Sequence, residues 1–183
     1  MPDHSYVARF GLTRRDLFLL PVCVLFIVVG KVMIADGSPL AGVMACLLGG
    51  LYIVASLLAL VSRRVALAVT AEGITLGQMP PWPASRSAFV PWSDIETVVL
   101  WRQHLARGNT MQYVGVVRRP GAPPLPGSAK SPKLRRLNKA FVPAHLSEDL
   151  VADSRQVAFW RLNKKRLSAA VHHFRPNVPV EER

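Results

Sequence analysis

The strongest constraint on this chain comes from two long apolar runs in its first third. The runs cover residues 17–35 and 40–61, and a short break at 36–39 separates them. A helix needs about 20 apolar residues to cross the hydrocarbon core of a bilayer. The pattern therefore predicts a transmembrane hairpin of two helices. Residues 1–16 are then a cytoplasmic N-terminal tail, and residues 63–183 form a polar domain large enough for a core of its own.

The charges that flank the two runs predict how the hairpin is oriented. Basic residues close to a span favour the cytoplasmic side of the membrane. They stand at the outer ends of the hairpin, at Arg9, Arg14, Arg15, Arg63 and Arg64. We therefore expect two spans with both termini in the cytoplasm. A cleaved signal peptide fits less well, because signal peptides have shorter apolar regions and here a second run follows at once.

Polar and small residues inside the runs favour packing over chemistry. Lys31 is either an intramembrane ion site or a side chain that reaches back to the interface, and its place near the end of the first run favours the second reading. Small residues at a spacing of four let helices approach closely. The second run holds two such rows, Ala41, Ala45 and Gly49 in one and Gly42, Cys46 and Gly50 in the other. They serve either packing within the hairpin or a homo-oligomer.

The charge of the chain points to an anionic partner. The formal net charge is +12, and residues 63–183 hold 19 Lys and Arg against 8 Asp and Glu. A basic domain tethered to a bilayer is expected to meet its anionic phospholipid surface rather than nucleic acid. Residues 118–139 are rich in proline and are expected to form a mobile loop. Its candidate lipid-contacting residues are Lys130, Lys133, Arg135, Arg136 and Lys139; a solvated linker is the alternative.

The polar domain shows the pattern of a small α+β fold. Alternating or apolar runs predict strands at 65–70, 74–76, 95–101, 111–117 and 156–160, with hairpin turns at 71–73 and 106–109. Ser147 is placed to cap a short helix ending near Asp153, and Asn163 is placed to cap a second helix at 164–174. Strands followed by a terminal amphipathic helix predict an antiparallel sandwich or open barrel that the helix closes.

The sequence offers little that indicates catalysis. It has no nucleophile elbow, no phosphate-binding glycine loop and no cysteine pairs with zinc spacing. His172 and His173 are adjacent on a predicted helix, so their side chains diverge and make a poor metal pair. We expect no catalytic residues, no bound metal and no cofactor.

Several segments together resemble a known group of membrane proteins. A two-span hairpin is followed by VTAEGIT at 69–75 and VPWSDIETV at 90–98, and the tail repeats the likeness at 159–163, 167–171 and 176–180. These segments resemble the bacterial pleckstrin-homology-like (PH-like) membrane proteins, in particular the actinobacterial low-molecular-weight protein antigen family. The resemblance implies a PH-like domain of antiparallel strands capped by a C-terminal helix, and no catalytic site. It also implies that the membrane is a bacterial plasma membrane.

The sequence thus predicts a non-enzymatic inner-membrane protein. Its cytoplasmic PH-like domain is expected to bind anionic lipid headgroups, or a protein, at the membrane surface. The alternative is an oligomeric membrane scaffold or an accessory subunit of a larger complex.

Overall fold

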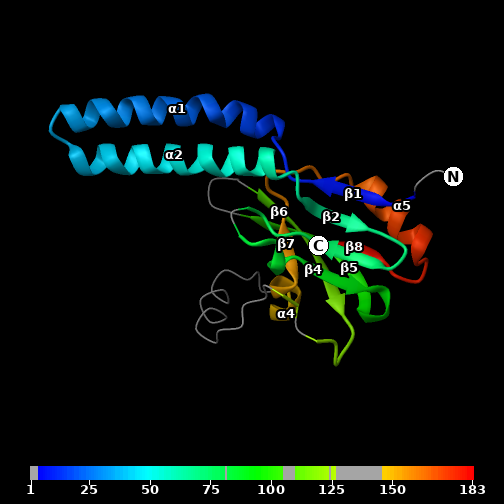
Figure 1. Cartoon of the computed structure of the whole chain (residues 1–183). Helices are drawn as coiled ribbons and strands as arrows, with labels where there is room; N and C mark the ends of the chain where they lie inside the picture. The colour runs from blue at the N-terminus through cyan, green and yellow to red at the C-terminus, as the bar shows by residue number, and fades with distance from the viewer. Residues whose placement is uncertain (1–3, 81, 105–109, 124, 127–145) are drawn as a thin grey trace. The chain divides into compact units, whose positions relative to one another are not determined.

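The computed structural model describes residues 4–80, 82–104, 110–123, 125–126 and 146–183. The chain divides into two compact units. One is a helical hairpin that spans residues 10–64 together with 79–81, and the other is a sheet domain built from the remaining segments (Figure 1).

The hairpin consists of α1 (Arg14–Ala35) and α2 (Pro39–Ser62), which run antiparallel beside each other (Figure 1). Thr13 and Asp16 form a reciprocal capping box that starts α1. Gly37 has a φ of +84°, a value that glycine adopts without steric cost, in the turn between the helices. Pro39 begins α2, where its missing N–H is not needed. The two runs predicted from sequence are therefore helices.

The apolar side chains of both helices point mostly outward. Only 6% of the most apolar stretch of α1 is buried, and only 17% of the most apolar stretch of α2. Phe18, Leu40 and Val61 are about four-fifths exposed. The core helix of a soluble protein would bury such residues. At about 1.5 Å per residue, helices of 22 and 24 residues are also long enough to cross a membrane.

The first sheet of the domain contains a strand that the sequence did not predict. Its order is β1 (Tyr6–Arg9), β2 (Val65–Val69), β3 (Gly73–Leu76) and β4 (Ala88–Pro91), and all neighbours are antiparallel. Part of the segment expected as a tail is thus β1, which precedes the hairpin and pairs with the strand that follows it. A strand of four residues is too short to stand out by alternation alone.

Two rows of side chains cross the inner face of this sheet. One row is Tyr6, Val69, Ile74 and Val90, and the next is Ala8, Leu67, Leu76 and Ala88. All eight residues are buried. Because alternate residues of a strand face opposite sides, the register places every one of these side chains in the core.

The second sheet has the order β7 (Ser154–Gln156), β6 (Thr110–Arg118), β5 (Ile95–His104) and β8 (Val180–Glu182). β8 pairs in parallel with β5 and was not predicted. On one face, α4 (Glu148–Ala152) brings Leu150 against Val99 and Trp101. The other face carries buried Val98, Leu100, Val114 and Val116.

The strand predicted at 156–160 is wrong, because β7 ends at Gln156. The Trp160 indole N–H donates to the Gln156 carbonyl oxygen at 3.2 Å, and Phe159 has a φ of +57°. The chain therefore turns where the apolar composition predicted an extended run. The expected turn at 106–109 lies outside the described residues.

Both predicted helices of the domain are confirmed. Ser147 accepts a hydrogen bond from the Leu150 N–H and caps α4. Asn163 accepts from the Arg166 N–H and caps α5 (Lys164–Phe174). α5 buries Leu167, Ala170 and Val171. In coarse terms, the fold is that predicted: two long apolar helices and a small domain with antiparallel strands.

Candidate functional site

Glycine lets the two helices of the hairpin approach each other closely. A Cβ atom at Gly49 would stand 2.7 Å from the Cys23 carbonyl oxygen, and one at Gly30 would stand 2.7 Å from the Gly42 carbonyl oxygen. Both distances are shorter than side-chain carbons tolerate, so larger residues would push the helices apart. The Cys46 thiol, 3.6 Å from the Ile27 carbonyl oxygen, completes the contact.

The contact uses part of each predicted small-residue row. Gly42, Cys46 and Gly49, at spacings of four and three, face α1. Gly50 has open space around it, and Ala41 is exposed while Ala45 is half-buried. Gly30 of α1 was not singled out from sequence, although a glycine inside an apolar run is itself a signal of close packing. Cys23 and Cys46 are free thiols.

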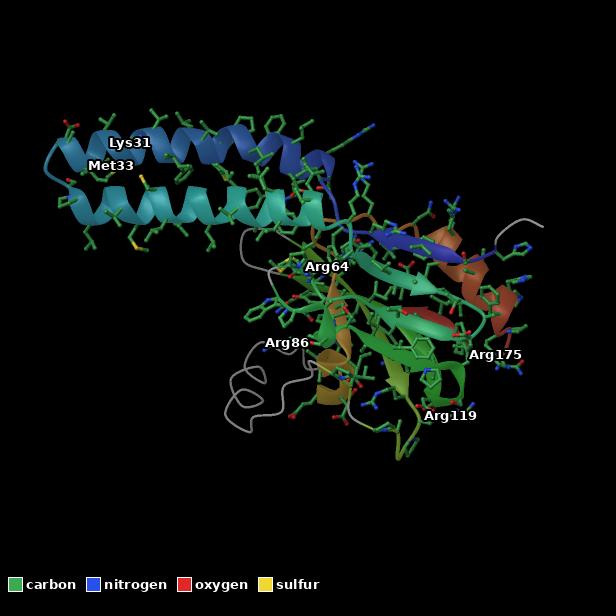
Figure 2. The ribbon with its side chains drawn as sticks, viewed as in Figure 1. Lys31, Met33, Arg64, Arg86, Arg119 and Arg175 are labelled. Atoms are coloured by element: carbon green, nitrogen blue, oxygen red, sulfur yellow. The ribbon has the colours of Figure 1, made fainter. Side chains whose placement is uncertain are left out.

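A carboxylate lies buried at the start of α1. Asp16 is 5% exposed and accepts a hydrogen bond from the Tyr52 hydroxyl at 2.7 Å. The same carboxylate accepts from the Thr13 backbone N–H in the capping box. These contacts join the first turn of α1 to the middle of α2. Lys31, by contrast, is exposed near the end of α1 beside the turn between the helices (Figure 2).

The predicted lipid-contacting residues, Lys130, Lys133, Arg135, Arg136 and Lys139, lie outside the described residues. The structure does describe the start of the loop that carries them. Arg118 forms an ion pair with Asp153 at 2.6 Å and donates to the Pro123 carbonyl oxygen. Arg155 donates to the Pro126 carbonyl oxygen at 3.1 Å.

Burial makes this cluster sensitive to substitution. The Asp153 side chain is 4% exposed and that of Arg118 is 15% exposed. Burial lowers the pKa of Arg155 from its ordinary value, and the nearby Asp153 carboxylate opposes that effect. Leu125, also buried, anchors the loop between the two arginine contacts. The first residues of the loop are therefore held against β6 and β7.

Two further arginines occupy equivalent positions in two proline turns. Arg119 precedes Pro120 and Gly121, and the turn closes with a hydrogen bond from the Ala122 N–H to the Arg119 carbonyl oxygen at 3.2 Å. Gly121 has a φ of +87°, as the third residue of a type II turn requires. Arg175 precedes Pro176 in the same way, and the Val178 N–H donates to its carbonyl oxygen at 3.0 Å.

Arg119 and Arg175 line one pocket in the sheet domain, with a volume of about 380 Å³. Figure 2 shows both side chains on the same side of this domain. The remaining lining residues come from the start of β5, from the 3₁₀ turn before it (Trp92–Asp94) and from the segment after α5: Trp92, Ser93, Ile95, Glu96, Asn177 and Val178. Sequence analysis missed this site, although each arginine stands in an Arg-Pro pair.

No protein-family model, no curated protein and no solved structure matches this chain. Among the described residues, no three His, Cys, Asp or Glu side chains gather as a metal site would require.

Proposed function

We propose that this protein is a non-enzymatic integral membrane protein whose PH-like domain binds the anionic lipid surface beside its own hairpin. The observation that carries the proposal is the pair of long helices with outward apolar side chains, joined directly to a basic domain. α2 ends at Ser62 and β2 begins at Val65. Between these elements stand only Arg63 and Arg64.

The pairing of β1 with β2 supports a two-span arrangement. β1 precedes α1, and β2 follows α2. Two strands can pair only if they lie on the same side of the membrane, which two spans provide. The pairing also argues against a cleaved signal peptide, because cleavage after α1 would remove a strand whose Tyr6 and Ala8 are buried.

The flanking charges support a cytoplasmic domain, and the resemblance to bacterial proteins is the ground for proposing a bacterial plasma membrane. The basic residues at the outer ends of the hairpin obey the positive-inside tendency. Each Lys or Arg near an anionic leaflet contributes about 1 kcal/mol, reduced by salt. The five basic residues of the loop are part of the excess positive charge of the domain, and that excess supports docking at an anionic surface. The PH-like assignment rests on the sequence resemblance and agrees with antiparallel strands followed by a helix.

Energy transfer in nanodiscs tests the proposal on the full chain. All four tryptophans, Trp82, Trp92, Trp101 and Trp160, belong to the domain and none to the hairpin. Transfer to a dansyl-labelled lipid headgroup therefore reports the distance from the domain to the bilayer. We expect transfer to rise when phosphatidylglycerol replaces part of the phosphatidylcholine, and to fall again with added salt.

A matched pair of variants locates the contact. The loop variant replaces Lys133, Arg135 and Arg136 with glutamine. The control variant replaces three exposed residues, Arg161, Lys165 and Arg166, with glutamine. It therefore removes the same amount of charge as the loop variant. The proposal predicts that the loop variant loses the response to anionic lipid and the control keeps it. Energy transfer that does not depend on lipid charge would refute lipid docking. Binding to a protein partner would then remain as the alternative.

The alternative function is an oligomeric scaffold or an accessory subunit. It is based on the two rows of small residues in α2. Gly42, Cys46 and Gly49 already pack against α1 within one chain. Crosslinking of a Gly50→Leu variant in nanodiscs tests the alternative, because Gly50 has no neighbour within 4 Å. An oligomer that packs through this position would lose its crosslinks.

A further inference from the structure

We propose that the pocket between the two proline turns binds a phosphate monoester through Arg119 and Arg175. The inference rests on the proposed function, since a lipid headgroup is one source of such a ligand. A free phosphate ester in the cytoplasm is the other source, and its chemistry at the pocket is the same.

The charge of the two arginines matches the ligand. Within the described part of the chain, neither guanidinium has an ion-pair partner. Two other basic residues of the domain do have such a partner, Arg118 in Asp153 and Lys164 in Glu182. A phosphate monoester carries a charge of about −1.5 to −2 near neutral pH. Two guanidinium groups, each able to donate a pair of parallel hydrogen bonds, suit that charge and its oxygens.

The size and lining of the pocket suit a small polar ligand. Its volume of about 380 Å³ lies near the lower end of the range for small-molecule sites. Ser93 and Asn177 add a hydroxyl and an amide to the lining. Trp92 and Ile95, which are both buried, add apolar surface to the lining. A lining that combines apolar side chains with a few polar groups is usual for such a site.

Backbone hydrogen bonds hold the walls of the pocket in place. The Arg119 N–H donates to the Asp94 carbonyl oxygen at 2.9 Å, which ties the end of β6 to the turn before β5. The Val98 N–H donates to the Pro179 carbonyl oxygen at 3.0 Å, which ties the segment after α5 to β5. The Trp92 indole N–H donates to the Thr70 carbonyl oxygen at 2.9 Å. Little ordering of the backbone is then needed when a ligand binds, which favours affinity.

Glu96 allows a second test of the proposal, in which a substitution should strengthen binding instead of weakening it. Its carboxylate lines the same pocket and is exposed. It repels an anion there, so Glu96→Gln is expected to tighten binding of a phosphate ester. A pocket built for a cation or a neutral ligand would not respond in this direction.

The experiment is a calorimetric titration of the full chain, in neutral detergent, with glycerol 3-phosphate. We expect saturable binding that Arg119→Gln/Arg175→Gln weakens by about tenfold or more for each arginine. The control Arg161→Gln/Arg166→Gln removes the same charge at exposed positions outside the pocket. It should bind as the unaltered protein does. Arg119→Lys/Arg175→Lys keeps the charge without the planar fork and should bind with intermediate affinity.

Two results would overturn the proposal. One is no saturable binding up to about 1 mM, the weak end of specific affinity. The other is equal weakening in the pocket and control variants, which would indicate a general effect of charge. Both arginines are exposed, so the variants are expected to fold, and their tryptophan fluorescence checks this.

Nanodiscs then distinguish the two sources of ligand. Phosphatidic acid carries a phosphate monoester, whereas phosphatidylglycerol carries a diester. If discs containing phosphatidic acid suppress the binding of glycerol 3-phosphate, the ligand of the pocket is a lipid headgroup. If binding is unchanged, the ligand is a soluble phosphate ester. Because the detergent titration needs no bilayer, phosphate binding with no energy transfer response would mean that lipid docking has failed while the pocket proposal stands.

Discussion

Replacing Asp153 with asparagine should destabilise the sheet domain strongly. Asp153 pairs with Arg118 at 2.6 Å, and the two side chains are only 4% and 15% exposed. Removing one partner of a buried ion pair costs about 3–5 kcal/mol, because the other charge stays buried without compensation. That is a large part of the total stability of a domain, which is about 5–15 kcal/mol.

The control is the exposed ion pair between Lys164 and Glu182. Its side chains are 32% and 59% exposed, so Glu182→Gln should cost no more than about 1 kcal/mol. Both variants remove one carboxylate and keep the shape of the side chain. The comparison therefore isolates burial as the cause of any difference.

Tryptophan fluorescence during urea unfolding, on the full chain in neutral detergent, measures both effects. Every tryptophan lies in the sheet domain, so the signal excludes the hairpin. Equal, small losses for Asp153→Asn and Glu182→Gln would refute the reasoning from burial. The double variant Arg118→Met/Asp153→Leu gives a further check, because removing both charges should restore much of the loss.

Three further predictions concern the hairpin, β1 and alkaline pH. Gly49→Ala should weaken hairpin packing by about 1–3 kcal/mol in a detergent denaturation series, whereas Gly50→Ala, which meets open space, should be neutral or stabilising. Tyr6→Phe removes the hydroxyl that accepts from the Asn163 N–H at 3.0 Å, and it should cost about 1–3 kcal/mol in the urea assay; no change would mean that β1 adds little to the domain. Burial raises the pKa of Tyr113, so its folded state keeps the proton that the unfolded state loses above about pH 10. Stability from this group is present below that pH and falls as the pH rises further, and Tyr113→Phe should make the alkaline decline in the urea midpoint shallower.

Much of the local structure was predictable because its causes are local. Asn163 and Ser147 were expected as caps from their place before apolar-periodic segments, and both side chains accept the expected hydrogen bonds. A turn was expected at 71–73, and β2 and β3 do pair across it, although Gly73 has no positive φ and is itself the first residue of β3. These features depend on residues within a few positions of one another.

The prediction at 156–160 failed for a nonlocal reason. Apolar composition favoured a strand, but β7 pairs with β6 only as far as Gln156. Beyond it, Trp160 becomes buried and its indole hydrogen-bonds back to Gln156. Intrinsic strand preference is weak, and the packing of a large aromatic side chain outweighs it.

The apolar length of the first third was enough by itself to predict two helices able to cross a bilayer, because that requirement concerns consecutive residues. Tertiary structure decided which small residues face the opposite helix and that Tyr6–Arg9 joins the sheet as β1. It also brought Arg119 and Arg175 to one pocket, although they stand far apart in the chain. Such juxtapositions depend on strand register and on long-range packing, which the order of residues along a single segment does not record.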